Sequence, residues 1–310
     1  MLRVLLLYLA GAGWARSLIT HFFVARRVAR RFVAGETMAD AVSATRRANA
    51  EGLLVTLDFL GEAVHSPEDA EQAAAQYLTI LDTIAENDLQ ATVSLKLTQL
   101  GLDVSAELCT TNMRRILAHA AQYGNHVTID MESADYTDCT LQMYRTLRHE
   151  YDFDNVGTVI QSYLYRSDAD MAALKQEGAF VRLCKGAYKE PPEVAYPDKK
   201  DVDASYVRLM QGYLADGAAP PGTYLGIATH DVRMIDAARE IITAHDVPAD
   251  RYEFQMLYGI RSDLQRELVQ QGYKMRVYVP FGTEWYPYFM RRLAERPANL
   301  WFFVSNLLRG

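Results

Sequence analysis

The chain has 310 residues, of which 50% are hydrophobic and 23% are charged, a composition typical of a soluble globular protein with a large core. The formal net charge of −7 and the lack of a basic stripe argue against a nucleic-acid partner. Three widely spaced cysteines without a CxxC motif encode neither a disulfide framework nor a zinc site, and they predict a reducing, cytoplasmic compartment. The seven histidines form no HxH or HExxH motif, so we expect no metal site.

Residues 1–50 predict a helical extension. The run from Val4 to Trp14 is apolar but too short to span a bilayer, which takes about 20 residues. It resembles the hydrophobic part of a signal peptide, but a single positive charge precedes it and the cysteine usage is not that of an exported protein. We interpret it as a buried helix or as a helix on the inner face of the cell membrane. Phe22 to Ala48 is predicted to be helical, with Thr37 as N-cap and Asp40 in the capping box.

From Leu53 onward, short apolar runs alternate with longer stretches of helical period. Eight strands alternating with helices predict an α/β fold whose parallel sheet closes into a (β/α)₈ barrel, because eight is the number of strands that closes such a sheet. No Gly/Ser/Pro linker divides the repeats, so we expect one catalytic barrel domain over residues 51–310. The predicted strands are Leu53–Phe59, Thr92–Leu97, Val127–Met131, Thr158–Tyr163, Phe180–Cys184, Tyr224–Ala228, Tyr252–Met256 and Met275–Val279. Helix starts are predicted near Ser66, Ser105, Ser167, Asp201, Asp231 and Glu284.

The carboxyl ends of the predicted strands are rich in polar residues. Active sites of such barrels lie at these ends, so the side chains there are candidates for binding and catalysis. A barrel that served packing alone would carry aliphatic residues at these positions. The polar residues are Glu62, Lys96, Asp130, Gln161, Arg182, Lys185, Thr229, His230, Gln255 and Tyr278.

Lys96 and Arg182 lie inside apolar strands, where an unpaired charge is costly. Both therefore need anionic partners, and Asp130 and Glu62 are candidates for that role, either as salt-bridge partners or as catalytic acids. The dipeptide Thr229-His230 precedes a helix and is interpreted either as a helix cap or as a ligand contact. Several cations beside aromatic residues suit a small carboxylate together with a large phosphate-bearing cofactor.

The stretch after the last strand carries two adjacent arginines. On a helix, Tyr288, Arg291, Arg292 and Glu295 share one face, since they are spaced by three, four and seven positions. Two guanidiniums held together suit a carboxylate between them. The alternative is a solvated face on which both arginines pair with Glu295, at about 0.2–0.5 kcal/mol per pair.

Taken together, these residues resemble the proline dehydrogenase family, the flavin enzymes of proline catabolism. The similarity runs in order from about Leu60 to Asn306 and covers most of the predicted barrel. It implies a distorted (β/α)₈ barrel that binds FAD and oxidises L-proline to Δ1-pyrroline-5-carboxylate. The blocks that carry the resemblance are Leu95 to Thr98, Ile129 to Glu132, Gln161 to Leu164, Arg182 to Tyr188, Ala228 to His230, Glu253 to Gly259 and Arg276 to Asn306.

The resemblance also implies roles at matched positions. Asp130, Arg182 and Tyr278 are the expected catalytic residues, with Arg182 beside flavin N5 and Asp130 orienting both Lys96 and Arg182 without touching the substrate. The expected substrate contacts are Lys96, Arg291 and Arg292 to the proline carboxylate and Tyr278 and Tyr288 to the ring, with Glu62 paired to one arginine of the clamp. Glu295, from the shared helix face rather than from the resemblance, is expected to hold the two arginines in place. The expected FAD contacts are Met131, Gln161, Arg182, Lys185, Gly186, Ala187, Thr229 and His230.

The resemblance further implies hydride transfer from proline C5 to the flavin and electron transfer to a quinone, with a separate pyrroline-5-carboxylate dehydrogenase as a further partner. Two alternatives from other classes stay open. A Schiff-base lyase would use Lys96 or Lys185 as the amine nucleophile. A flavin-binding or carboxylate-binding module would hold its ligand without catalysis.

Overall fold

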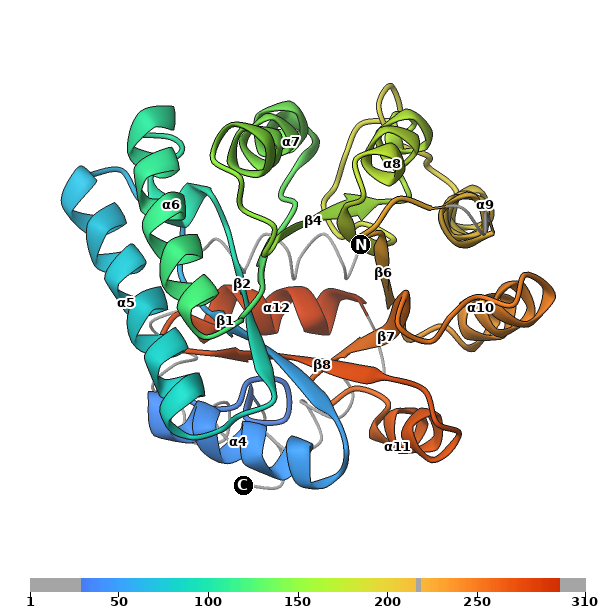
Figure 1. Cartoon of the computed structure of the whole chain (residues 1–310), viewed down its shortest axis with the longest axis horizontal. Helices are drawn as coiled ribbons and strands as arrows, with labels where there is room; N and C mark the ends of the chain where they lie inside the picture. The colour runs from blue at the N-terminus through green and yellow to red at the C-terminus, as the bar shows by residue number, and fades with distance from the viewer. Residues whose placement is uncertain (1–28, 216–218, 296–310) are drawn as a thin grey trace.

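A computed structural model describes residues 29–215 and 219–295, with side chains described as far as Arg292. Eight parallel strands form a closed barrel in which neighbours in sequence pair and β8 pairs with β1 (Figure 1). The strands are β1 (Leu54–Phe59), β2 (Ala91–Leu95), β3 (Val127–Ile129), β4 (Val156–Gln161), β5 (Phe180–Cys184), β6 (Tyr224–Ala228), β7 (Tyr252–Leu257) and β8 (Met275–Phe281).

Helices alternate with the strands, and all of the described helices except the last surround the barrel on its outside (Figure 1). They are α4 (Met38–Ala50), α5 (Pro67–Glu86), α6 (Ala106–Gln122), α7 (Thr137–Arg145), α8 (Ser167–Gln176), α9 (Lys199–Leu214), α10 (Val232–Ala244), α11 (Ser262–Gln270) and α12 (Trp285–Glu295). Three short helical turns complete them: η1 (Thr98–Leu100), η2 (Ala134–Tyr136) and η3 (Thr146–Glu150).

The predicted α/β barrel is confirmed. β5 and β6 agree with the predicted strands to the residue, whereas β4 begins at Val156, before the predicted start at Thr158. The difference lies at Gly157, which interrupts the apolar run in the sequence. In the structure Gly157 pairs with Phe180 on β5, and an ideal Cβ at Gly157 would lie 2.5 Å from the Phe180 ring. A glycine is therefore part of the strand because the neighbouring side chain fills its space.

Alternation along the strands sorts apolar from polar residues. In β5, Val181 and Leu183 belong to the large apolar core, whereas Arg182 between them contacts side chains from strands that are not its neighbours. Successive side chains of a strand point to opposite faces, so Arg182 points into the barrel interior. The same alternation in β7 places Phe254 in the apolar core.

Three of the predicted helix starts are confirmed by side-chain caps, whereas α9 begins at Lys199, before the predicted start near Asp201. Ser66 accepts a hydrogen bond from the backbone N–H of Asp69, Ser105 accepts one from Leu108, and Asp231 accepts one from Arg233. Each side-chain oxygen satisfies one of the N–H groups that lack a partner inside the helix. These caps therefore mark where each loop after a strand ends and the next helix begins.

Within the predicted extension, Thr37 and Asp40 form the expected capping box at the start of α4. α4 buries Ala41, Ala44 and Ala48 in the same core as β1 and β8, so this helix packs on the barrel. The apolar run from Val4 to Trp14 lies outside the described residues, and the division at residue 50 stays a prediction. No helix in the described part of the chain is long and apolar enough to cross a membrane.

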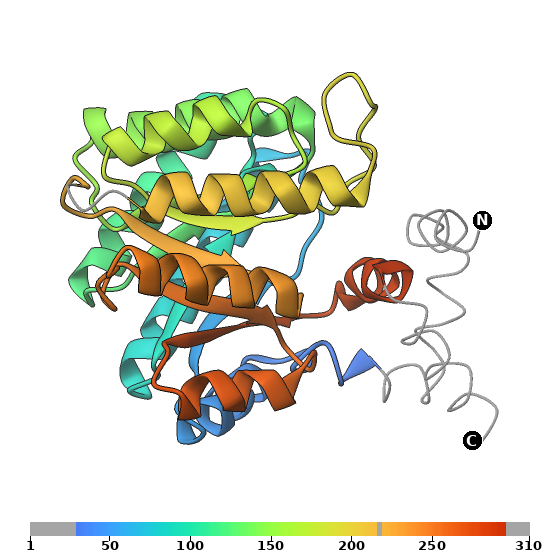
Figure 2. The same ribbon diagram turned by 90° about the vertical axis from the view of Figure 1, so that its right-hand side faces the viewer.

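The last helix, α12, departs from the outer ring. In Figure 1, viewed down the shortest axis of the molecule, α12 lies across the middle of the picture inside the ring of helices, and in Figure 2 it lies beyond the carboxyl end of β8. Together the two views place α12 over the mouth of the barrel. This displacement agrees with the distorted barrel that the resemblance implied.

His126, at the amino end of β3, predicts a pH dependence of stability. Its ring lies 4.5 Å from the Phe180 ring, and its Nε2 atom is buried without a hydrogen-bond partner among the described residues. Burial lowers the pKa of His126 to about 3, and the charges of Arg276 and Arg182 act in the same direction. The folded protein therefore keeps the imidazole neutral while the unfolded chain takes up a proton below about pH 6.5.

We expect the free energy of unfolding to fall as the pH drops below about 6.5, by at most about 1.4 kcal/mol per pH unit from this group. His126→Gln should reduce that loss, measured by urea unfolding at about pH 7 and about pH 5. His245→Gln, at an exposed position, is the matched control and should keep the pH dependence of the unmodified chain. An equal loss in the His126→Gln variant would contradict the assignment.

Candidate active site

An ion pair between Arg182 on β5 and Asp130, the residue after β3, forms the centre of the site. Arg182 Nη1 lies 2.6 Å from Asp130 Oδ1, and the side chains are 7% and 14% exposed. β4 separates the two strands, so the contact crosses the barrel interior. Burying two charges is costly unless they are paired and hydrogen-bonded, and this geometry satisfies both conditions.

Further hydrogen bonds complete the surroundings of this ion pair. Arg182 Nη1 donates to Ser94 Oγ at 2.9 Å, and Arg182 Nε donates to Gln255 Oε1 at 2.6 Å. The hydroxyl of Tyr278 donates to Asp130 Oδ2 at 2.6 Å, and the Arg182 guanidinium carbon lies 5.2 Å from the Tyr278 ring centroid. The structure thus brings together the three residues predicted to be catalytic. Ser94 was missed, although it is a polar residue inside an apolar strand.

Tyr278 is a hydrogen-bond donor in this cluster. Burial raises the pKa of Tyr278 well above its ordinary value, and the carboxylates of Asp130 and Asp58 add to the rise. The phenol therefore stays protonated at neutral pH. Its proton lies on the hydrogen bond to Asp130.

Lys96, which follows β2, pairs with a carboxylate that the sequence analysis did not consider. Its Nζ lies 3.4 Å from Oδ1 of Asp58 on β1, whose side chain is 2% exposed. Burial opposes the charge of Lys96, but Asp58 and Asp130 outweigh it and hold the pKa of Lys96 above its ordinary value. Asp130 pairs with Arg182 as expected, whereas Asp58 replaces Glu62 as the ion-pair partner of Lys96. Asp58 carried the same sequence signal as Lys96, a charge inside an apolar run.

α12 brings Tyr288, Arg291 and Arg292 to the mouth of the barrel. The Arg292 guanidinium carbon lies 5.1 Å from the Tyr288 ring centroid, as expected for residues four positions apart on one helix face. Tyr288 is buried, and both arginines are half-buried. The side chain of Glu295, on the same face, lies outside the described residues.

Tyr188, after β5, links α12 to the strand ends electrostatically. Burial raises the pKa of Tyr188 and Glu132 adds to the rise, whereas the charges of Lys96 and Arg291 oppose it. Lys96 and Arg291 therefore act on the same phenol although they come from distant parts of the sequence.

Lys185, one of the predicted cofactor contacts, belongs to a cluster of opposite charges at the ends of β5 and β6. Its Nζ pairs with Asp203 and lies 2.9 Å from Asp231 Oδ2. Lys199 and Arg233 bind the same two carboxylates, and their side chains are 66% and 67% exposed. Three cations against two carboxylates leave positive charge there, which suits a phosphate-bearing ligand. Lys199 and Arg233 were missed because a charge on a helix carries no special signal.

Thr229 and His230 follow β6 and are both engaged by backbone groups. Asp231, not Thr229, is the N-cap of α10, and Thr229 Oγ1 accepts a hydrogen bond from the backbone N–H of Asp231 at 3.1 Å. His230 Nε2 accepts a hydrogen bond from the backbone N–H of Leu257 at 2.9 Å. That nitrogen therefore carries no proton, and the proton of the neutral ring is on Nδ1.

Gln161, at the end of β4, provides the test of whether the site fits a bound cofactor. Its Nε2 donates to the backbone oxygens of Met131 and Glu132, at 3.4 and 3.2 Å. Its Oε1 is buried and has no hydrogen-bond partner among the described residues, so it fits a donor on a ligand. Gly186 has φ +103°, and an ideal Cβ there would lie 2.5 Å from a neighbouring aromatic ring. Ala187, next to it, is exposed.

Glu62 lies in the loop after β1 and is exposed. It makes no hydrogen bond or ion pair with any residue in the described ranges 29–215 and 219–295. The loop passes over Gln99, whose Nε2 donates to the backbone oxygen of Phe59 at 3.1 Å, and an ideal Cβ at Gly61 would lie 2.1 Å from that nitrogen. The pairing of Glu62 with an arginine of α12 stays a prediction.

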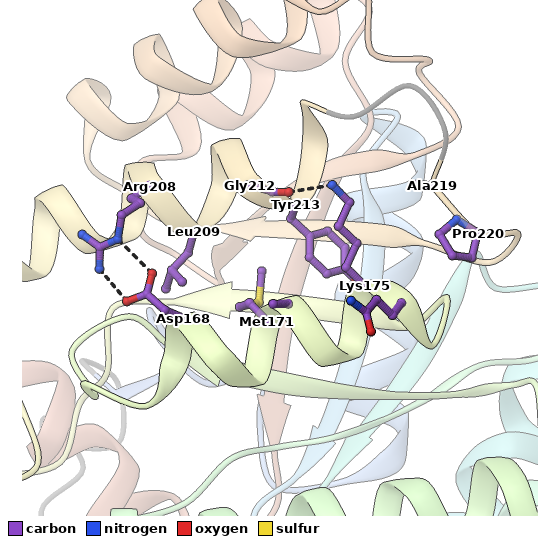
Figure 3. Close-up of a pocket in the computed structure, with 11 residues that line it drawn as sticks. Asp168, Met171, Lys175, Arg208, Leu209, Gly212, Tyr213, Ala219 and Pro220 are labelled. Atoms are coloured by element: carbon purple, nitrogen blue, oxygen red, sulfur yellow. Dashed lines mark hydrogen bonds and ion pairs between the residues drawn. The ribbon is translucent and has the colours of Figure 1, made fainter.

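A cavity of about 580 Å³ lies between α8 and α9 on the outer wall of the barrel (Figure 3). Arg208 in its wall donates two hydrogen bonds to Asp168, at 2.8 and 2.7 Å. Lys175 donates to the backbone oxygen of Gly212 at 2.7 Å. These charged groups are already paired, and none of the predicted site residues lines the cavity. The cavity therefore lies apart from the predicted site residues.

Comparison with known proteins agrees with this geometry. The family model described as proline dehydrogenase matches residues 41–304. The chain belongs to the proline dehydrogenase family. The resemblance inferred from the strand ends is thereby confirmed, and the matched range includes most of α4 as well as the barrel.

The chain is 46% identical over 281 residues to Proline dehydrogenase 1 of Bacillus subtilis (strain 168), with 91% of each chain covered. It is 43% identical over 286 residues to Proline dehydrogenase of Deinococcus radiodurans, again with 91% of each chain covered. A solved structure of proline utilization A (PutA) from Bdellovibrio bacteriovorus, inactivated by N-propargylglycine, superposes with a TM-score of 0.81 at 26% identity. That superposition covers 90% of this chain and 33% of the PutA chain, so this chain spans about a third of that protein.

The ion pair of Lys96 with Asp58 generates a prediction. Asp58→Asn removes the nearer carboxylate while burial of Lys96 remains, so the pKa of Lys96 should fall. One pKa unit corresponds to about tenfold more free amine at a pH below both pKa values. Amine acylation followed by mass spectrometry should therefore show about tenfold faster modification of Lys96 at mildly alkaline pH. Asp135→Asn, at an exposed position, is the control and should leave the rate unchanged.

Proposed function

We propose that the chain oxidises L-proline to Δ1-pyrroline-5-carboxylate with FAD as hydride acceptor, the first step of proline catabolism. Membership in the proline dehydrogenase family supports the reaction class and the substrate. The observation that carries the proposal is the convergence of Lys96, Arg182 and the arginines of α12 on one barrel mouth. Proline is a small carboxylate with an apolar ring, and cations beside tyrosines suit both parts.

In this proposal, Lys96, Arg291 and Arg292 bind the proline carboxylate. Guanidiniums provide paired donors for a carboxylate, and the raised pKa of Lys96 keeps its ammonium charged. Tyr278 and Tyr288 contact the ring and exclude water from the reacting carbon. The positive groups fix the orientation of proline, and such positioning is a large part of what a site contributes to hydride transfer.

The residues proposed to hold FAD lie at the ends of β3 to β6. FAD, when bound, supplies the two-electron acceptor for the hydride. Gln161 Oε1, a buried acceptor without a partner among the described residues, fits a ligand N–H, and the positive charge around Lys185 fits phosphate. The other proposed contacts are Met131, Gly186, Ala187, Thr229 and His230.

Arg182 and Asp130 are proposed to act as a unit. Arg182 provides a fixed positive charge that stabilises negative charge developing on the acceptor. Asp130 holds the Arg182 guanidinium and the Tyr278 hydroxyl, at 2.6 Å each, and both of its oxygens are used in doing so. It therefore orients the two residues that face the ligands and needs no bond to the substrate.

A lysine-based lyase is disfavoured by the electrostatics of the site. A Schiff-base lysine must be deprotonated to attack a carbonyl, whereas Asp58 and Asp130 hold the pKa of Lys96 above its ordinary value against the effect of burial. Lys185 is held by two carboxylates. Neither amine is prepared for nucleophilic attack.

One experiment tests the proposal directly. The purified protein should show flavin absorbance bands, and L-proline added without air should bleach them. A protein without flavin, or with flavin bands that proline does not change, would contradict the proposed reaction. Trapping of a carbonyl substrate by borohydride would support the lyase instead.

The proposed electron acceptor is a membrane quinone, with the apolar N-terminal run within residues 1–20 as the region of peripheral contact with the cell membrane and the cytoplasm as the compartment. A separate pyrroline-5-carboxylate dehydrogenase is the proposed consumer of the product. A second stage of the same experiment tests the acceptor. Liposomes that contain quinone should restore the bleached absorbance faster than liposomes without it, and equal rates would contradict this part of the proposal.

The proposed clamp predicts a substrate-binding defect. Arg292→Lys keeps the charge but loses the planar pair of donors, so KM for proline should rise. Hydrogen bonds between charged groups contribute about 1.5–3 kcal/mol, which corresponds to a rise of roughly 10- to 100-fold. Steady-state kinetics measures it. Arg266→Lys, on exposed α11, is the control, and an equal KM in both variants would remove Arg292 from the clamp.

A further inference from the structure

A network of hydrogen-bonded polar side chains lies below Arg182, toward the amino ends of the strands. Glu253 and Gln255 lie two residues apart on β7, so they share the inner face of the barrel. Arg276 on β8 pairs in register with Gln255 and reaches Glu253 with its guanidinium. Glu253 is 1% exposed and Gln255 is 5% exposed. This network thus connects β5, β7 and β8 inside the barrel, beneath the proposed catalytic arginine.

The hydrogen bonds of this network determine the orientation of the Gln255 amide. Gln255 Nε2 donates to Glu253 Oε1 at 2.7 Å, and Arg276 Nε donates to the same oxygen at 2.6 Å. A carboxylate only accepts hydrogen bonds, so the NH₂ end of the amide must face Glu253. The oxygen end is then left for Arg182, whose Nε donates to it at 2.6 Å. With the reverse orientation, two donors would meet at Arg182.

β6, which separates β5 from β7, makes room for this contact. Its residue Gly226 pairs with Arg182 on one side and with Glu253 on the other. An ideal Cβ at Gly226 would lie 2.5 Å from Gln255 Nε2. Any side chain at this position would displace the amide, so the glycine keeps open the space through which Gln255 reaches Arg182.

The consequence for Arg182 is a fixed guanidinium plane. Nε is held by Gln255, and Nη1 is held by Asp130 and Ser94. A guanidinium is rigid and planar, so two held nitrogens fix the direction of the third. Nη2 donates no hydrogen bond to any residue within 29–215 or 219–295 and is available to a ligand.

We propose that Gln255 is a positioning residue for Arg182, and that the Glu253–Arg276 ion pair below it selects which end of the amide faces the guanidinium. This inference rests on the proposed function, in which Arg182 acts on the hydride acceptor. In this proposal, Gln255 and Glu253 affect kcat, whereas Lys96 and the arginines of α12 determine proline binding and therefore KM.

The test uses the flavin-loaded protein and three variants. Gln255→Leu removes both hydrogen bonds of the amide at similar size. Glu253→Gln replaces the carboxylate with a group that both donates and accepts, so the amide of Gln255 loses its selected orientation. Gln265→Leu is the matched control, because Gln265 is also buried and hydrogen-bonded, but to the backbone oxygens of Leu257 and Ile260.

We expect Gln255→Leu to lower kcat by about tenfold or more with KM for proline changed by less than about twofold. Glu253→Gln should show the same pattern with a smaller loss, and Gln265→Leu should keep kcat. An unchanged kcat in Gln255→Leu, a parallel change in KM, or an equal loss in Gln265→Leu would overturn the proposal. If Gln255→Leu does not fold, the kcat and KM of Glu253→Gln decide in the same way.

A second readout separates this proposal from the proposed function. The Nε–H proton of Arg182, followed by nuclear magnetic resonance, should exchange with solvent at least about tenfold faster in Gln255→Leu and Glu253→Gln than in the unmodified chain. This exchange needs neither proline nor turnover. If proline fails to bleach the unmodified protein, the proposed function falls, and the exchange rates still decide whether Gln255 holds Arg182. Unchanged exchange in both variants would overturn the positioning role.

Discussion

The cost of burying charge inside the barrel is the constraint on which the site depends. Among the described residues, three cations enter the interior, and each has a carboxylate within 3.4 Å: Lys96 with Asp58, Arg182 with Asp130, and Arg276 with Glu253. An isolated buried charge would cost several kcal/mol, so none of these cations is tolerable without its partner. The partners come from other strands, and a shift of register would separate them. The strand register that closes the barrel is therefore also the register that brings these ion-pair partners together.

These pairs also explain how the site remains able to bind an anion. Inside the barrel, each positive charge is balanced by a negative one, so the interior pairs alone have little net attraction for a carboxylate. α12, which lies beyond the carboxyl end of β8 (Figure 2), carries the half-buried Arg291 and Arg292. The combination gives rigid, balanced groups from the strands and additional positive charge from one helix. In the proposed function, rigid strand ends set the geometry, and the helix supplies additional positive charge for the substrate carboxylate.

The sequence predicted much of this arrangement, because strand and helix signals are local. The apolar runs, the caps at Ser66, Ser105 and Asp231, and the shared face of Tyr288 and Arg292 depend on residues near one another in the chain. Polar strand ends were also recognised one strand at a time. Which residues pair is not local, because it depends on the register of strands that meet only when the barrel closes.

The pairing of Lys96 illustrates this limit. Its partner Asp58 lies 38 positions earlier in the chain, and both carry the same signal of a charge within an apolar run. No local pattern says that these two meet while Asp130 goes to Arg182. Likewise, the space above Gly226 is visible only when Arg182 and Gln255 are placed on either side of it. Such features are properties of the closed barrel.

The position of α12 depends in turn on the segment before α4. Trp285 Nε1 donates to Glu36 Oε1 at 3.0 Å, and the ring centroids of Phe32 and Phe289 lie 6.2 Å apart. The backbone N–H of Gly282, at φ +125°, donates to the oxygen of Gly35 at 3.0 Å. These contacts hold the connection between β8 and α12 to a stretch at the other end of the described chain. The arginines over the barrel mouth are thus positioned by residues that precede the barrel, because a helix displaced from the outer ring loses the packing that its neighbours receive and needs anchors of its own.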